Sequence, residues 1–160
     1  MNDFQSGKLK KAVTFSYDDG PANDTRLAEL FNKYGVKGTF HLNSRKYIGM
    51  NDEELDASGK MYEGHEISCH TVHHGWLNRM LPASIVNEVM EDRKLLERIA
   101  GYPVVGMSYP YGTYDNAAIE AIRACGIVYC RTTMKEHHAL ELPKDFLAWH
   151  PTCHHRDIGQ

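Results

Sequence analysis

The sequence predicts an α/β fold in which short parallel strands alternate with helices, and two observations lead to this prediction. Short apolar runs bounded by glycine alternate along the chain with segments whose apolar residues recur every three or four positions. Strands and helices that alternate in this way form parallel sheets. The chain of 160 residues is long enough for one domain with its own core, so we expect a single domain over residues 1–160.

Three strands and two helices are expected in the first half of the chain. Residues 12–17 form an apolar run that predicts the first strand. Residues 24–34 predict a helix, because their apolar positions recur at helical spacing and a glycine follows them. The second and third strands are expected at residues 37–42 and 65–69, with a turn at residues 49–52 and a short acidic helix between them.

Two helices and three further strands are expected in the second half. Residues 82–100 predict a long helix that opens on proline, and residues 116–125 predict a shorter one. The three strands are expected at residues 104–109, 127–131 and 146–149. A full eight-unit barrel typically needs about 250 residues. The six expected strands therefore predict either a smaller, distorted barrel or an open sheet.

Composition excludes several classes of protein. The net charge is -3, with 42% hydrophobic and 24% charged residues, and the chain has no long basic run. We therefore expect no nucleic-acid partner. No apolar run reaches about 18 residues, so we expect no membrane partner. Residues 1–8 lack the apolar stretch of a signal peptide, and the four cysteines form no C-x-x-C pair. A cytoplasmic location with reduced cysteines is the expectation.

Two adjacent carboxylates, Asp18 and Asp19, follow the first predicted strand and precede Gly20 and Pro21. Adjacent like charges repel, which raises one pKa unless a cation lies between them. A divalent metal bound by one aspartate relieves this repulsion and leaves the other free to act as a base. The alternative is a turn with two solvated carboxylates, because Asp, Gly and Pro dominate turns.

Two histidines four residues apart, His70 and His74, follow the third predicted strand. If the chain turns helically after the strand, they lie on the same side, one turn apart, as in helical metal-binding pairs. Two imidazoles and one carboxylate can hold zinc with a position left open for water or substrate. His73 then faces elsewhere. The alternative is a polar loop in which these histidines only form hydrogen bonds.

Two further clusters lie near expected strand ends. Tyr109, Pro110, Tyr111 and Gly112 follow a strand, and a backbone held by proline and glycine can aim an amide N–H at a developing oxyanion, although such a tetrapeptide alone is often a turn. The pair His154 and His155 could supply ligands or a proton donor; otherwise it belongs to a polar tail.

Taken together and in this order, the three clusters resemble the polysaccharide deacetylase family, also called the NodB homology domain or carbohydrate esterase family 4. Its first motif is matched by residues 16–20, its second by residues 70–74 and its third by residues 110–112. The similarity extends over about residues 12–131. The resemblance implies a deformed (β/α) barrel of the NodB type. We expect fewer than eight strands here, and one expectation is an incomplete barrel truncated at its C-terminus.

The resemblance also implies an activity and a role for each site residue. The implied activity is metal-dependent hydrolysis of N-acetyl groups on amino sugars, with zinc expected ahead of cobalt, manganese or nickel. Asp18 would be the general base that takes a proton from the attacking water. The other implied roles are Asp19, His70 and His74 as metal ligands, the Tyr111 amide as oxyanion donor, Tyr17 and Pro110 as substrate-binding residues, and His154 or His155 as general acid.

Two departures from the family pattern leave alternatives open. Ser108 stands where the third motif has an arginine that orients the base, so either another cation such as Arg131 takes over or the base is tuned differently. The late family histidine is either His154 or His155, or it is missing. One alternative is thus a truncated or inactive metal-binding domain that needs self-association as a homo-oligomer. A second is a cyclic-amide hydrolase on the same scaffold, acting on a small amide substrate.

Overall fold

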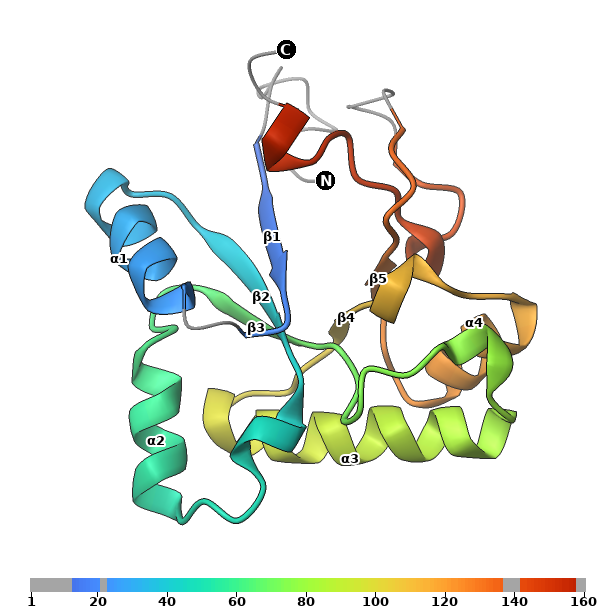
Figure 1. The fold of residues 1–160 in the computed structure, drawn as a ribbon, viewed down its shortest axis with the longest axis horizontal. Helices are drawn as coiled ribbons and strands as arrows, with labels where there is room; N and C mark the ends of the chain where they lie inside the picture. Colours follow the sequence, from blue (N-terminus) through green and yellow to red (C-terminus); the bar gives the residue numbers. More distant parts are fainter. Residues whose placement is uncertain (1–12, 21–22, 137–141, 158–160) are drawn as a thin grey trace.

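Five short parallel strands lie side by side in chain order, so each strand pairs with the one before it (Figure 1). The computed structural model describes residues 13–20, 23–136 and 142–157. Its strands are β1 (Phe15–Asp18), β2 (Gly38–Leu42), β3 (Glu66–Cys69), β4 (Gly106–Ser108) and β5 (Tyr129–Arg131). Its helices are α1 (Asp24–Tyr34), α2 (Asp52–Lys60), α3 (Pro82–Ala100) and α4 (Asn116–Ala124).

The sheet is curled into part of a barrel. In a flat sheet four strand spacings would separate β1 from β5 by about 19 Å. In this structure the carboxylate of Asp18, at the end of β1, forms an ion pair with the guanidinium of Arg131, at the end of β5. The contact requires the two edge strands to approach each other at their carboxyl ends. The prediction of a deformed barrel with fewer than eight strands is therefore confirmed.

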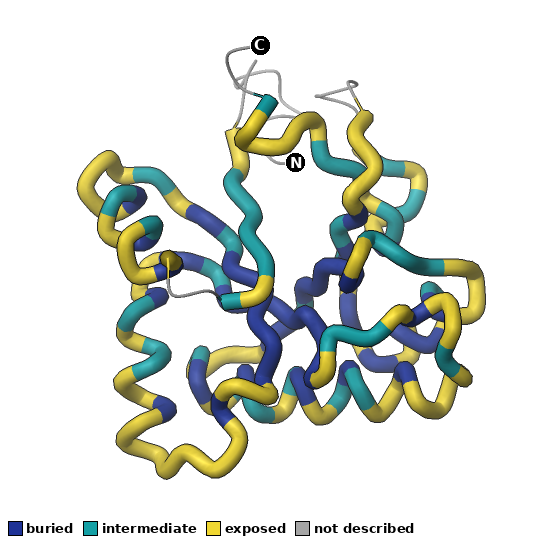
Figure 2. Tube along the Cα trace, in the orientation of Figure 1, coloured by how far each residue is buried: buried dark blue, intermediate teal, exposed yellow. Residues whose placement is uncertain are grey.

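The predicted helices match the structure because their end signals are strong. Helix α3 begins with Pro82 in its first turn and ends at Gly101, whose φ of 74° is left-handed. Helix α2 has a capping box, in which Asn51 and Glu54 each bond the other's backbone N–H. Figure 2 shows buried residues concentrated on β2, β3 and β4 and on the side of α3 that faces them, whereas β1 is of intermediate burial.

The prediction of a strand at residues 146–149 is wrong. Phe146–Ala148 form a 3₁₀ turn, η4, whose start is capped by the Asp145 side chain accepting a hydrogen bond from Leu147 N. Only Trp149 continues the sheet, through a single parallel bridge to Arg131. An apolar run of four residues does not distinguish a strand from a buried turn, and the preceding aspartate favours the turn.

Two further features of the described residues bear on the other expectations. Cys69, Cys125 and Cys130 are buried and Cys153 is exposed, and all four are free thiols. No helix within the described ranges combines the length and the apolar character needed to cross a membrane.

Candidate metal centre and active site

Three side chains from two loops converge at the carboxyl end of the sheet. Asp19 Oδ1 lies 3.5 Å from His70 Nε2 and 3.3 Å from His74 Nε2. All three ligand atoms lie within 4.8 Å of one another. Oxygen and nitrogen ligands bound tetrahedrally at about 2.1 Å are separated from each other by about 3.4 Å. The observed spacing and the donor set of one carboxylate and two imidazoles therefore fit a divalent ion such as zinc.

The two histidines are brought together by an irregular loop, and the helical turn on which their predicted pairing is conditional does not form. Thr71 and His74 have φ angles of 64° and 54°, which no helical turn contains. His74 N donates to Thr71 Oγ1 at 3.0 Å, which replaces a helical hydrogen bond. His73 faces away from the site, as the sequence predicts, and its N and Nδ1 lie 2.9 and 2.6 Å from the carboxylate of Glu88.

Backbone strain is concentrated around this cluster. Within the described ranges, four residues other than glycine have a left-handed φ: Asp19, Thr71, His74 and Tyr111. Each costs on the order of 1–2 kcal/mol, because the side chain crowds the backbone there. All four lie in loops that follow β1, β3 or β4. Such clustering is typical of functional sites that the surrounding structure holds in place.

His70 is oriented for ligation by the strand beside it. Its Nδ1 lies 2.8 Å from the carbonyl oxygen of Ser108, which can only accept, so Nδ1 carries the proton. The lone pair is then on Nε2, the atom that faces Asp19. Burial lowers the pKa of His70, which favours the neutral form that a metal requires.

Asp18 lies next to the three candidate ligands and is held through one oxygen. Its Oδ1 accepts a hydrogen bond from Ser108 Oγ at 2.9 Å and another from the guanidinium of Arg131. Burial opposes ionisation, but the interactions with His41, Arg131 and His70 outweigh it and lower the pKa of Asp18 to about 2. Since buried His41 is neutral at pH 7, the permanent cation beside Asp18 is Arg131.

Arg131 is itself fixed by a chain of polar contacts from β1 and β2. Its Nε donates to Ser16 Oγ at 2.7 Å, and Ser16 Oγ lies 2.9 Å from His41 Nε2. Arg131, at the end of β5, therefore places a cation beside Asp18, where Ser108 stands in the motif position that carries an arginine in the family. The Ser108 hydroxyl instead bridges Asp18 and His70 Nδ1, at 2.9 and 2.8 Å.

The buried His41 leads to a prediction about stability. Burial lowers its pKa from 6.5 to about 3, so below pH 6.5 the unfolded chain binds a proton that the folded chain does not. The free energy of unfolding should fall by on the order of 2–3 kcal/mol between pH 6.5 and pH 4.5 from this residue alone. In His41→Gln, the fall in the free energy of unfolding between pH 6.5 and pH 4.5, measured by urea unfolding at each pH, should be smaller by that amount. A fall as large as in the wild type would contradict the prediction.

The remaining predicted site residues lie around the cluster at different distances from it. The Tyr111 ring packs on His74, with centroids 4.4 Å apart, and Pro110 beside it is buried. Tyr17 is half-buried, and its ring stacks on His155 at 5.9 Å. His154 packs on His155, and both are exposed. Among the described residues, the group that could hold a metal includes neither His154 nor His155.

Sequence reasoning missed Trp76 and Lys46. The Trp76 ring stacks on Tyr111 with centroids 4.6 Å apart and is 42% exposed, so an aromatic surface adjoins the cluster. A tryptophan two residues after His74 in a polar stretch could have indicated this. Lys46 Nζ donates to the backbone carbonyls of Asp19 and Gly20 and so holds the turn that carries the aspartates.

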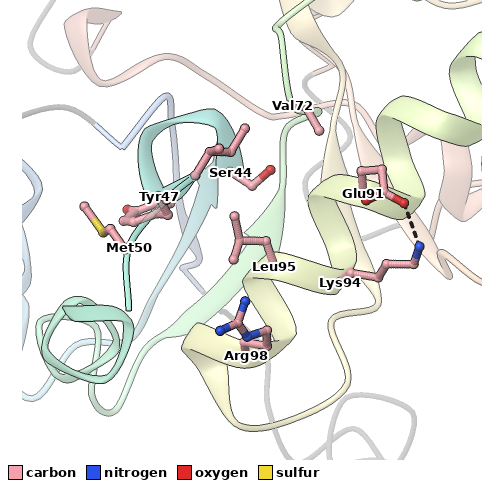
Figure 3. Close-up of a pocket in the computed structure, with 10 residues that line it drawn as sticks. Ser44, Tyr47, Met50, Val72, Glu91, Lys94, Leu95 and Arg98 are labelled. Atoms are coloured by element: carbon pink, nitrogen blue, oxygen red, sulfur yellow. Dashed lines mark hydrogen bonds and ion pairs between the residues drawn. The ribbon is translucent and has the colours of Figure 1, made fainter. Parts of the chain in front are cut away.

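A hollow of about 300 Å³ lies between the segment after β2 and helix α3 (Figure 3). It is bounded by the segment after β2, by Val72 and by the face of α3 that carries Glu91, Lys94 and Arg98. Neither Asp18 nor any of the three candidate ligands lines it. The hollow is therefore not part of the candidate metal site.

The curled parallel sheet and the carboxylate–imidazole cluster define a barrel-type α/β domain with a candidate site for a divalent metal. The family model described as "Polysaccharide deacetylase" matches residues 5–130. The chain belongs to the polysaccharide deacetylase family, as the three motifs predicted.

Curated relatives agree with this assignment, and a solved structure shares the fold. A chitin deacetylase of Pestalotiopsis is 30% identical over 119 residues, covering 74% of this chain and 40% of the relative. A peptidoglycan-N-acetylglucosamine deacetylase of Bacillus cereus is 33% identical over 113 residues, covering 68% and 39%. The chain thus spans about two fifths of the length of these relatives. The Streptococcus pyogenes deacetylase PplD, solved in complex with acetate, shares the fold with a TM-score of 0.73 at 16% identity, covering 93% of this chain and 68% of PplD.

Proposed function

We propose that this domain hydrolyses acetyl groups from N-acetylated amino sugars, using a divalent metal held by Asp19, His70 and His74, with zinc expected first. The observation that carries the proposal is that Asp19 Oδ1 lies 3.5 Å from His70 Nε2 and 3.3 Å from His74 Nε2, beside a separately held carboxylate, Asp18. Family membership supports a glycan deacetylase, and the names of both curated relatives describe deacetylases of glycans.

Asp18 is suited to accept the proton of the attacking water. When bound, a divalent ion supplies positive charge for a carbonyl oxygen and for water. Asp18 Oδ1 is occupied by Ser108 and Arg131, and within the described ranges no side chain or amide donates to Oδ2. The charge of Arg131 keeps the carboxyl ionised, which is the form that can take a proton. We therefore assign proton transfer to Oδ2.

The loop after β4 supplies the groups that meet the substrate. The backbone of Tyr111 is held at a φ of 56° beside His74, and we assign its N–H to the developing oxyanion. The exposed rings of Tyr111 and Trp76 form an aromatic surface on which a sugar ring can pack. Pro110 fixes the start of this turn, and we assign to it and to Tyr17 on β1 the substrate-binding roles expected for them.

The proton for the departing amine is assigned to His154 or His155, as the resemblance implies. His155 packs on the Tyr17 ring, so the segment that carries both histidines lies against β1. His155 is exposed, so its ring is open to solvent.

Removal and return of the metal test the proposed function. Treatment with a chelator is expected to abolish acetate release from N-acetylglucosamine oligomers and peptidoglycan fragments, and about one equivalent of zinc per chain should restore it. Metal content is measured on the same samples. Failure of the protein to bind zinc would overturn the proposal.

Two other outcomes would each favour an alternative. Hydrolysis of a small cyclic amide without acetate release from sugars would indicate the cyclic-amide reaction. Stoichiometric metal binding without turnover of either substrate, in a sample that light scattering shows to self-associate, would indicate an inactive domain.

A further inference from the structure

We propose that two buried polar side chains, Asp92 on α3 and Asn43 after β2, are positioning residues that hold the His70–Thr71 segment in its metal-binding geometry from the side opposite the site. This inference rests on the proposed role of His70 as a metal ligand. It adds a second layer to that role, formed by residues that touch neither metal nor substrate.

Asp92 is a charged residue type at a buried, apolar position of its helix. It lies in the apolar stripe of α3, whose other members are Ile85, Val89, Leu96 and Ile99, and it is 0% exposed. A carboxyl group in such a position costs several kcal/mol unless hydrogen bonds compensate it. Within the described ranges it forms no ion pair with a lysine or an arginine. Its compensation must therefore come from neutral donors.

Those donors are two backbone amides at the base of the site. Asp92 Oδ1 accepts from Ser44 N at 2.7 Å, and Oδ2 accepts from His70 N at 2.9 Å. His70 N also lies 3.1 Å from the carbonyl oxygen of Leu42, so the two acceptors share this donor. One buried carboxyl group therefore connects the segment after β2 with the first residue after β3, which is the candidate ligand.

Asn43 holds the same peptide segment from its carbonyl side. Its Nδ2 donates to the carbonyl oxygens of His70 and Thr71, at 2.8 and 3.0 Å, and the side chain is 7% exposed. Asp92 and Asn43 together fix the N–H and the carbonyl of His70. They thereby stabilise the left-handed φ of Thr71, which directs the chain on toward His74.

The hold on His70 extends to the other candidate ligand loop. Ser44 begins the 3₁₀ turn η1 (Ser44–Tyr47), which packs against α3 (Figure 3). Lys46 in the same turn donates to the backbone carbonyl of Asp19. Both loops that carry ligands are therefore anchored, directly or through η1, to one carboxyl group on α3. We infer that Asp92 sets the distance between these loops before an ion arrives.

Substitution of Asp92 by asparagine tests this inference. The amide places an N–H2 group against one of the two backbone N–H donors, so one hydrogen bond is replaced by a repulsive contact. Residues that orient metal ligands from outside typically change metal affinity by about 10- to 100-fold. We expect Asp92→Asn to raise the dissociation constant for zinc by that factor in a chelator competition titration. The visible spectrum of the Co²⁺-loaded protein should change as well, because it reports ligand geometry.

Two matched controls separate positioning from general stability. Leu96→Ala removes a buried side chain one turn further along the same stripe, so it should lower the melting temperature without touching either loop. Asp115→Asn changes a carboxyl group that accepts from Ala118 N and so caps the start of α4. Both should bind zinc within about two-fold of the wild type. Equal weakening in Leu96→Ala would overturn the inference, as would wild-type affinity in Asp92→Asn.

Amide hydrogen exchange of the metal-free protein provides a readout that does not depend on metal or activity. The His70 and Ser44 amides should be protected in the wild type and in Asp115→Asn, and exchange faster in Asp92→Asn. If the wild type binds no metal, the proposed function fails, and this exchange pattern still decides whether the anchor exists. If Asp92→Asn does not fold, Asn43→Asp, which sets a carboxylate against two carbonyl oxygens, must show the same loss of zinc affinity or the inference is wrong.

Discussion

Replacement of Asp18 by asparagine is expected to lower acetate release by about a thousand-fold, while zinc stays bound with unchanged affinity. Loss of a positioned general base typically costs 10²- to 10⁴-fold, and a neutral amide cannot accept the proton at the position of Oδ2. The amide oxygen can still accept from Ser108 and Arg131, so the local structure should persist. Initial rates on an N-acetylglucosamine oligomer and the metal content of the same sample measure both effects.

The control for this variant is Asp56→Asn. Asp56 is exposed on α2, and Lys60 one turn away is its only ion-pair partner among the described residues, so activity should stay within about two-fold of the wild type. Loss of metal from Asp18→Asn, together with retention of metal by Asp19→Asn, would mean that the two adjacent aspartates have the opposite roles.

Replacement of His74 by alanine is expected to weaken zinc binding by at least about a hundred-fold, because one of three ligands is removed and second-layer changes alone reach that size. The neighbouring variant His73→Ala should bind zinc within about two-fold of the wild type. His73 is adjacent to His74 in the chain, but it is hydrogen-bonded to Glu88 and faces away from the cluster. Competition titrations of both proteins against a coloured chelator give the two affinities.

This pair also distinguishes the two readings of the histidine-rich loop. If both variants lost zinc equally, the effect would come from disruption of the loop and not from loss of a ligand. If His73→Ala alone lost zinc, the geometry in which His74 Nε2 faces Asp19 at 3.3 Å would not be the one that binds metal.

Local signals were sufficient to predict most of the elements and the candidate ligands. The apolar stripe of α3 lies between Pro82, which favours a helix start, and Gly101, which favours a helix end, so both ends of the helix could be predicted. Asp18, Asp19 and His70 directly follow apolar runs, and the carboxyl ends of parallel strands meet at one edge of a sheet. Their proximity therefore follows from fold class alone.

The contacts that complete the site depend on long-range geometry and could not be predicted in this way. Arg131 reaches Asp18 only because the sheet curls through five strands, and no local pattern encodes the degree of curl. Aspartate is usually exposed, so the sequence pattern of the helix places Asp92 on its solvated face, whereas the structure buries it. The left-handed φ of Thr71 could not be predicted either, because the spacing of four between His70 and His74 is also that of a pair on a helix.

The chain order of the sheet has a consequence for how this protein folds during synthesis. Each strand can pair with a neighbour that has already emerged, so the sheet can grow from β1 in the order of translation. The Asp18–Arg131 contact spans 113 positions of sequence and must wait for β5. The three candidate ligands Asp19, His70 and His74, and the groups of Asp92 and Ser108 that hold His70, all precede that strand. A nascent chain stalled before β5 would therefore carry the candidate metal ligands while Asp18 still lacks its contact with Arg131.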